Sequence, residues 1–246
     1  MFKNGTKSNH ILDALPAEER ARLAAHLEKV DMPLGAVIHE AGAAQTLVYF
    51  PIDCVVSLLY VLEDGDTAEV AIVGDDGIVG MPVITGGSRS PHRAIVQAAG
   101  VAWRMQARDL RTEFERAGAT QQILLRYSQA LMMQIGQTAV CNRHHNLDQQ
   151  LCRWLLMSID RLPGNDLSMT QELIANMLGV RREGVTEAAG KLQHTGAIRY
   201  QRGRITVLDR AQLERHSCEC YEAVRTEYMR LLPWDTTASA NPLAAA

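Results

Sequence analysis

The 246-residue sequence predicts an α+β protein with an N-terminal antiparallel β-roll of jelly-roll type, one long helix and a C-terminal winged helix-turn-helix. Three observations support this fold class. Residues 32–105 are rich in valine and isoleucine and are interrupted repeatedly by glycine and aspartate turns, which is typical of short antiparallel strands. Residues 120–143 contain no proline and a single glycine, as a long helix requires. Residues 168–208 combine two short helical segments with a hairpin pattern.

The composition excludes several classes of protein. Apolar residues make up 47% and charged residues 22%, which is ordinary for a soluble globular chain. No apolar run reaches the roughly 18 residues that span a bilayer, and the first 15 residues lack the apolar core and cleavage site of a signal peptide. The five cysteines are odd in number and lack a zinc-ribbon spacing. We therefore expect a reduced, cytoplasmic protein with no membrane partner.

The net charge of -3 excludes a uniformly basic nucleic-acid-binding protein, so such a surface must be local. Residues 1–142 hold 12 basic and 16 acidic side chains, whereas residues 143–234 hold 13 and 11. The direction of this difference agrees with an acidic front half and a mildly basic back half.

The N-terminal domain is predicted to cover residues 1–118. Residues 10–30 have apolar positions at helical spacing, with Pro16 early, where a helix can begin. Short strands are expected at residues 47–50, 55–62, 69–73 and 94–98, and a short helix at residues 108–117.

Residues 119–146 are predicted to form a dimerisation helix and a hinge. A 4-3-4-3 spacing within residues 120–143 is typical of the seam between two helices. The residues at this spacing are Leu124, Ser128, Leu131, Ile135 and Thr138. The alternative is a core helix that packs against the roll of its own chain. The dimer seam is preferred because Met132, Met133 and Val140 make the helix apolar beyond one narrow face.

Residues 147–234 are predicted to form the winged helix-turn-helix, followed by a flexible tail at residues 235–246. A helix at residues 147–161 ends at Leu162-Pro163-Gly164-Asn165. The S-x-x-Q pattern of residues 168–171 predicts a capping box that opens a helix ending at Gly179. A second helix follows from Val180 to about His194. The apolar positions that close the two helices on each other are Ile174, Leu178, Val180, Val185 and Ala188, and Ala175 is the small residue at their approach.

The hairpin after these helices predicts contact with a phosphate backbone. Residues 197–200 and 205–208 have the pattern of two strands, and the turn between them, Gln201-Arg202-Gly203-Arg204, contains two arginines. A winged helix-turn-helix inserts its second helix in the DNA major groove. The alternative is a helical hairpin used only for packing, with the arginines solvated.

The exposed half of the second helix predicts base contacts from Arg181, Arg182, Glu183 and Glu187. Arginine forms bidentate bonds with guanine, and glutamate accepts from cytosine. Phosphate contacts, which position a protein without reading sequence, are expected from Thr170, Arg199, Arg202 and Arg204.

Over residues 10–225 the chain resembles the bacterial Crp/Fnr superfamily of transcription regulators. Matching residues in the roll are Pro33-x-Gly35, Ile38, Gly42, Val48-Tyr49-Phe50 and Gly77-x-x-Gly80. In the C-terminal half they are Thr170-Gln171-Glu172-x-Ile174-Ala175 and Gly179-Val180-x-Arg182-Glu183-x-Val185. The resemblance implies a homodimer that binds a near-palindromic duplex, with Arg182 and Glu183 as the pair that reads guanine and cytosine. It also implies RNA polymerase as a partner.

The departures from the family bear on the effector. Members that bind cyclic AMP have a glutamate after the first glycine of Gly77-x-x-Gly80, where this chain has Ile78, and their phosphate clamp is replaced by Arg93-Ala94. Cyclic AMP is therefore not expected, and the effector stays unknown. An N-terminal iron–sulfur cluster is not expected because the first cysteine is Cys54. Glu187 replaces a further family arginine, so the preferred operator can differ.

Neither a cofactor nor a metal is predicted. Cys218-Glu219-Cys220 could be a redox pair or half of a metal site, but the sequence shows no second pair nearby, so two inert thiols are preferred. His144-His145 could bind metal or haem, and a polar hinge is preferred. The chain has no cupin, P-loop, dinucleotide or hydrolase motif, so it is not expected to be an enzyme.

The sequence therefore predicts a DNA-binding transcription regulator. The alternative is a ligand-binding or interaction module whose helical hairpin docks another protein rather than DNA.

Overall fold

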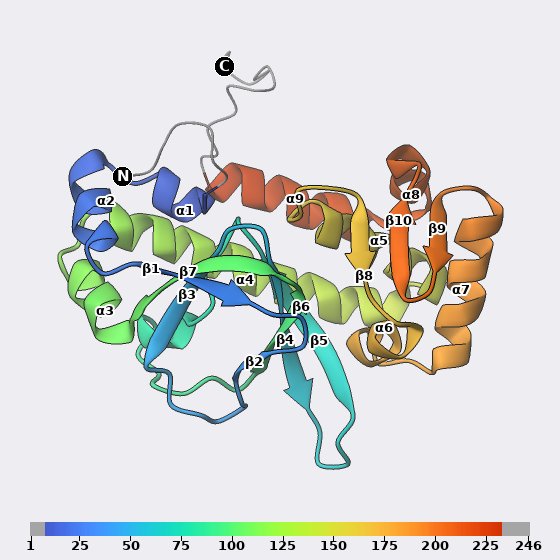
Figure 1. Ribbon diagram of the computed structural model, residues 1–246, viewed down its shortest axis with the longest axis horizontal. Helices are drawn as coiled ribbons and strands as arrows, with labels where there is room; N and C mark the ends of the chain where they lie inside the picture. Colours follow the sequence, from blue (N-terminus) through green and yellow to red (C-terminus); the bar gives the residue numbers. More distant parts are fainter. Residues whose placement is uncertain (1–7, 233–246) are drawn as a thin grey trace.

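The computed structural model describes residues 8–232, which form two units joined by one long helix (Figure 1). The N-terminal unit contains two antiparallel sheets, and the C-terminal unit contains a small three-stranded sheet surrounded by helices. This is the α+β architecture that the sequence predicts. Within residues 8–232, no helix combines the length and the apolar character needed to cross a membrane.

The two sheets of the N-terminal unit build the roll. The first has the order β1-β7-β3, formed by Glu28–Met32, Gly100–Gln106 and Leu47–Pro51. The second has the order β2-β6-β4-β5, formed by Val37–His39, Arg93–Ala98, Val55–Val61 and Thr67–Val73. All pairings are antiparallel. The core of the roll includes Val48, Phe50, Val56 and Val96, each at most 1% exposed. Strands β3, β4, β5 and β6 confirm the four short strands expected from the sequence.

The start of the chain confirms the helix expected to begin at Pro16, but the helical spacing predicted up to residue 30 ends earlier, at Ala24. Helix α1 covers His10–Asp13 and α2 covers Ala17–Ala24, because Pro16 cannot continue a helix and instead caps α2. Residues 28–32 form β1, in which Val30 faces Ala102 of β7. The hydrogen bonds of that ladder outweigh a weak local helical periodicity. Strands β2 and β7 and the short 3-10 helix η1, Met81–Val83, were also not predicted.

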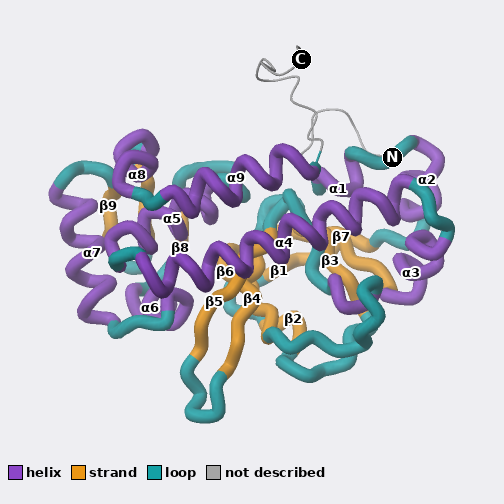
Figure 2. Tube along the Cα trace, turned by 180° about the vertical axis from the view of Figure 1, so that it is seen from behind, coloured by secondary structure: helices purple, strands orange, loops and turns teal. Residues whose placement is uncertain are grey.

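Helices α3, Ala107–Glu115, and α4, Ala119–His144, confirm the two helices expected after the roll. Helix α4 runs along both units (Figure 2). It packs one face on its own chain through a row of buried side chains: Ile123, Leu124, Tyr127, Ala130, Leu131, Gln134, Thr138 and Cys141.

The burial of α4 leaves only part of the predicted dimer seam accessible in the single chain. Leu124 is fully buried, Leu131 and Thr138 are each 8% exposed, and Ser128 and Ile135 are half-buried. Three of the five side chains, Leu124, Leu131 and Thr138, therefore pack against their own chain. The spacing could not decide between the faces because α4 carries apolar residues on both.

The C-terminal unit begins with α5, Leu147–Ile159, and its sheet has the order β8-β10-β9. The remaining elements are β8 at Asp166–Ser168, α6 at Gln171–Leu178, α7 at Arg182–His194, β9 at Ile198–Gln201, β10 at Arg204–Val207, α8 at Arg210–His216 and α9 at Glu219–Leu231. Helix α9 lies antiparallel beside α4, since Cys220 contacts Gln137 and Tyr228 contacts Gln134 (Figure 2). The tail predicted at residues 235–246 lies outside the described residues.

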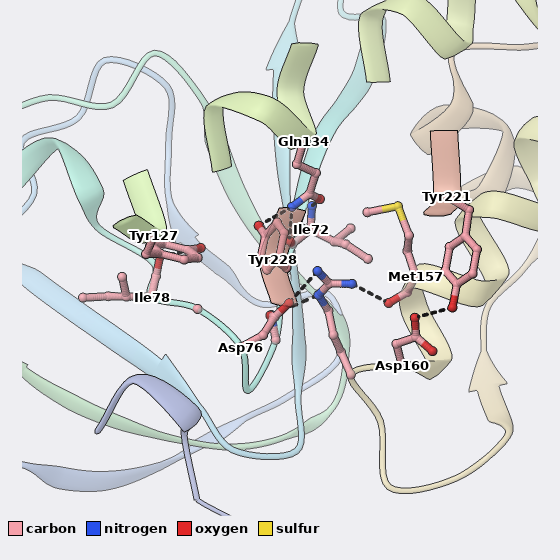
Figure 3. Close-up of polar contacts among 12 residues, drawn as sticks. Ile72, Asp76, Ile78, Tyr127, Gln134, Met157, Asp160, Tyr221 and Tyr228 are labelled. Atoms are coloured by element: carbon pink, nitrogen blue, oxygen red, sulfur yellow. Dashed lines mark hydrogen bonds and ion pairs between the residues drawn. The ribbon is translucent and has the colours of Figure 1, made fainter. Parts of the chain in front are cut away.

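Two buried polar contacts dock the units on each other. Arg161, which follows α5, forms an ion pair with Asp76 of the roll, with Nη2 2.5 Å from Oδ2, and its guanidinium lies 5.5 Å from the ring centre of Tyr228 (Figure 3). Trp154 of α5 donates its indole N–H to Glu69 of β5 at 3.0 Å. The C-terminal unit is thereby held in one orientation on the roll.

Candidate nucleic-acid interface

Helices α6 and α7 form the predicted helix-turn-helix. Gly179 between them has φ 65° and ψ 38°, a left-handed conformation that glycine adopts without steric cost. The apolar positions predicted to close the pair are turned inward, with Ile174, Val185 and Ala188 at most 1% exposed. The turn and its packing follow the sequence prediction.

The start of α6 differs from the predicted capping box. Thr170, not Ser168, is the N-cap, and its hydroxyl oxygen accepts from the Leu173 backbone N–H at 3.2 Å. Ser168 lies in β8, where it faces Arg204 of β10. Because β8 pairs with β10 of the wing, Ser168 lies in a strand and not at the start of α6. The local S-x-x-Q pattern does not reveal this long-range pairing.

The first turn of α7 presents unpaired cations. Arg181, the N-cap, and Arg182 are exposed and form no ion pair with any other residue of the described range 8–232, and Glu183 beside them is also exposed. Farther along, Glu187 pairs with Lys191 at 3.0 Å, and Lys191 also reaches Asp148 of α5 at 3.1 Å. These hydrogen bonds raise the pKa of Lys191.

The hairpin of β9 and β10 confirms the predicted wing. Its turn residues Arg202 and Gly203 both have positive φ, 50° and 74°, as a tight two-residue hairpin turn requires. The side chains of Arg199 and Arg202 are exposed and have no ion-pair partner among the described residues, whereas Arg204 lies 3.3 Å from Asp166 of β8.

The wing and the helix pair enclose a groove of about 470 Å³. Its lining brings together residues from both predicted contact sets: Thr170, Gln171, Glu172, Arg182, Tyr200, Arg202 and Gly203. Burial raises the pKa of the Tyr200 hydroxyl, and the nearby charge of Arg182 opposes that rise. The hydroxyl donates to the Met169 carbonyl at 3.0 Å, which fixes the floor of the groove.

The roll contacts the back of the helix-turn-helix, a contact that the sequence did not reveal. Thr67 at the start of β5 donates its hydroxyl to the Asn176 carbonyl of α6 at 3.3 Å. Ala68 lies close to the turn, because a Cβ built on Gly179 would be 3.7 Å from its Cβ. The β4–β5 hairpin therefore positions α6.

Four side chains able to bind a metal also meet, away from this groove. Cys218 and Cys220, expected to be inert, and His145, expected to lie in a polar hinge, come together with Cys141. Sequence reasoning missed them because Cys141 and Cys218 are 77 residues apart.

Comparison with known proteins identifies the helix-turn-helix. Residues 149–216 match the family model of the Crp-like helix-turn-helix domain. No curated protein matches the chain.

Solved structures with the same fold cover most of the chain. FixK2 from Bradyrhizobium japonicum is 15% identical, with a TM-score of 0.62, over 78% of this chain and 98% of that one. The Thermus thermophilus regulator TTHB099, of the CRP family, is 19% identical, with a TM-score of 0.63, over 77% and 96%. TTHA1359, a CRP/FNR-family regulator of the same organism, is 21% identical, with a TM-score of 0.59, over 79% and 98%.

The fold and the domain match define a β-roll joined by a long helix to a Crp-like helix-turn-helix domain with a wing. Residues 149–216 therefore carry a Crp-like helix-turn-helix domain, and the fold over most of the chain is that of solved regulators of the CRP and CRP/FNR families.

Proposed function

We propose that the chain is a homodimer that reads a near-palindromic DNA site with α7 and responds to a signal through its roll. In this proposal, residues 1–118 sense the signal, residues 119–146 form the dimer and residues 147–234 bind DNA. The protein would act in the cytoplasm and would have RNA polymerase as a further partner. The observation that carries this proposal is the groove in which Arg182 of α7 and Arg202 of the wing face the same space.

The base contacts are proposed for Arg181, Arg182, Glu183 and Glu187. Arg182 and Glu183 are the best-supported base contacts of the four, because both are exposed in the first turn of α7 and form no ion pair within residues 8–232. An unpaired arginine loses no internal partner when it bonds guanine O6 and N7. Glu187 must first release Lys191, so we rank it below the others.

The phosphate contacts are proposed for Thr170, Arg199, Arg202 and Arg204. Thr170 lies at the N-terminus of α6, where backbone N–H groups and the helix dipole favour an anion. Arg199 and Arg202 project from the wing, and Arg204 keeps Asp166 as an exchangeable partner.

The dimer face is proposed for the exposed stripe of α4, because three residues of the predicted seam, Leu124, Leu131 and Thr138, are buried in their own chain. Leu125, Met132 and Val140 are 51%, 58% and 49% exposed, and together they make an apolar stripe on one face of the helix. They lie at spacings of seven and eight residues, close to a heptad repeat. Gly136 lies on the same stripe, and no atom lies within 4 Å of a Cβ built on it, so a second helix could approach closely there.

The signal is proposed to differ from cyclic AMP. Ile78, at the position where the related proteins carry a ribose-binding glutamate, is 1% exposed. The fully buried ring of Tyr127 fills the adjacent space, and its hydroxyl donates to the Ile78 carbonyl at 3.4 Å. A nucleotide would have to displace both side chains.

The test begins with selection of bound sequences from a random duplex pool by the purified, reduced full-length protein. We expect a two-fold-symmetric site whose half-sites lie about 34 Å apart, one turn of DNA. On that site Arg182→Ala should lose about 1–3 kcal/mol of binding free energy and relax specificity at one base pair per half-site.

The matched control is Arg215→Ala, an exposed arginine on α8, which follows the end of β10 remote from the wing turn. This variant should bind like the wild type. Wild-type affinity of Arg182→Ala would contradict the assigned readout. Binding without salt dependence would instead favour a protein-docking module, because only phosphate contacts release counterions.

A further inference from the structure

We propose that Cys141, His145, Cys218 and Cys220 bind one zinc ion at the joint between the two units. We call these residues the thiol–imidazole cluster. They come from three places: Cys141 from the last turn of α4, His145 from the C-cap of that helix, and Cys218 and Cys220 from the start of α9. Each offers one ligand atom, and all four atoms lie within 4.8 Å of one another.

The distances agree with a tetrahedral metal site. Ligand atoms about 2.3 Å from a tetrahedral zinc lie about 3.8 Å from one another. Here the sulfurs of Cys141 and Cys218 are 3.5 Å apart, and the sulfur of Cys220 is 3.4 Å from Nδ1 of His145. With every pair of ligand atoms within 4.8 Å, an ion would be accommodated by side-chain adjustments of up to about 1 Å.

The surroundings of the ligands are those that metal sites use to orient them. Nδ1 of His145 faces the cluster, and its Nε2 lies 3.3 Å from the Glu219 carboxylate. A carboxylate behind a histidine fixes the ring and its tautomer for metal binding. The amide of Gln137 donates to the sulfur of Cys220 at 3.1 Å.

The backbone around the cluster is also held in place. Gln150 of α5 donates its side-chain amide to the His145 carbonyl at 2.8 Å. The two ligands at the end of α4 are thereby tied to α5 without any metal, so the site is partly preorganised.

The charge balance favours a divalent ion. Zinc bound by three thiolates and one imidazole has a net charge of -1, which is unfavourable when buried alone. The guanidinium of Arg153, 6% exposed, donates to Thr138 one turn before Cys141 and acts electrostatically on that cysteine. Its Nε has no hydrogen-bond partner within residues 8–232, and its charge acts on both Cys141 and Glu69, so it partly compensates the site.

The donor set selects zinc, and the burial indicates a structural role. Thiolate and imidazole ligands in a tetrahedron are typical of zinc, and four protein ligands leave no open position for a substrate. All three cysteines are buried and His145 is half-buried, so little solvent reaches the centre. The five cysteines are free, and 3.5 Å between sulfurs is far beyond a disulfide bond.

The position of the thiol–imidazole cluster in the fold indicates the structural role of the bound zinc. It would join the end of α4 to the start of α9 at the point where the chain turns into the C-terminal unit (Figure 2). Zinc would therefore fix the hinge on which the orientation of that unit depends.

The first experiment measures metal in the full-length protein, purified with a reductant and dialysed against a weak chelator. We expect close to one zinc per chain in the wild type and loss of most of it in Cys218→Ser and Cys220→Ser. Cys54→Ala, which changes a buried cysteine of the roll outside the cluster, should keep its zinc. Glu219→Gln should weaken zinc binding about 10- to 100-fold.

A second measurement remains decisive if the cysteine variants fail to fold. Cobalt(II) added to metal-free wild-type protein should give intense visible bands typical of tetrahedral geometry and a thiolate charge-transfer band in the near ultraviolet. The proposal is overturned if the wild type holds no zinc and cobalt remains octahedral. It is equally overturned if Cys218→Ser, folded, retains its zinc, or if the bound metal proves to be iron with sulfide.

Discussion

At the residue scale, Arg202 in the wing turn has a side chain that suits a DNA contact but not the backbone conformation of its position. Arg202 has φ 50°, a left-handed conformation that a long side chain adopts at some cost and that asparagine adopts more readily. A local requirement of the hairpin is thus met by a poorly suited residue. The presence of a cation there agrees with a role in contacting phosphate.

Arg202→Asn should therefore weaken DNA binding without weakening the fold. The loss of one phosphate contact per chain should reduce the slope of log affinity against log salt by about 0.9 per chain. The midpoint of thermal unfolding should stay the same or rise slightly, because asparagine suits the turn. Fluorescence anisotropy over a salt series and calorimetry measure the two quantities, with Arg215→Asn as control.

An unchanged salt slope with Arg202→Asn would remove this arginine from the set of phosphate contacts. A lowered unfolding temperature would show instead that the arginine supports the hairpin itself.

At the element scale, α4 has two apolar faces with different roles. One face carries Leu124 and Leu131 into the core of its own chain, and the other exposes Leu125 and Met132. Residues adjacent in the sequence therefore lie in opposite environments. Replacements on the buried face should act on folding, and those on the exposed face on association.

Met132→Glu tests this division. A charge in the proposed dimer face should raise the dimer dissociation constant at least tenfold, equivalent to about 1.4 kcal/mol, because two carboxylates would meet across the two-fold axis. Sedimentation velocity over a range of concentrations gives the constant. Met229→Glu on α9 is a matched control, since Met229 is 53% exposed and Met132 is 58% exposed.

Equal association of Met132→Glu and Met229→Glu would exclude this stripe from the interface. Helical content, followed by circular dichroism, should be the same in both variants, because neither side chain contributes to the core.

At the scale of the whole molecule, buried polar contacts between the units determine how the C-terminal unit sits on the roll. Burial raises the pKa of Glu69 to about 7, although the hydrogen bond from Trp154 and the charges of Arg153 and Arg161 lower it. In the unfolded chain the value is close to 4.5. The folded protein therefore binds this proton more tightly between about pH 4.5 and 7.

The free energy of unfolding should fall as the pH rises through this window, by up to about 3 kcal/mol from Glu69 alone. Glu69→Gln keeps an acceptor for Trp154 but stays neutral, so it should flatten the pH dependence and be more stable than the wild type at pH 7. Urea unfolding at pH 5 and pH 7.5 measures both effects. Glu63→Gln, exposed near the tip of the same hairpin, should follow the wild type.

A pH dependence in Glu69→Gln identical to that of the wild type would show that the carboxylate of Glu69 is accommodated in its charged form at the interface.

The parts of the fold that depend on local interactions could be predicted from the sequence. The turn at Gly179, the hairpin at Arg202-Gly203 and the length of α4 depend on backbone preferences within a few residues, and each was predicted. The residues proposed to contact DNA on α7 and the wing were likewise expected at exposed positions, because their apolar neighbours Val185 and Ile205 had to face inward.

Long-range contacts decided the rest. Strand β1 exists because it pairs with β7, about 70 residues later, and Ser168 leaves the helix cap because β8 pairs with β10. The face of α4 that is buried depends on where the roll and α9 lie, since both faces are apolar. The thiol–imidazole cluster forms only when α9 folds back along α4. The sequence by itself thus determined the fold class and the helix-turn-helix element, because their signals are local. Only the tertiary structure decided which face of α4 is buried in its own chain and brought the thiol–imidazole cluster together, because both depend on which distant segments meet.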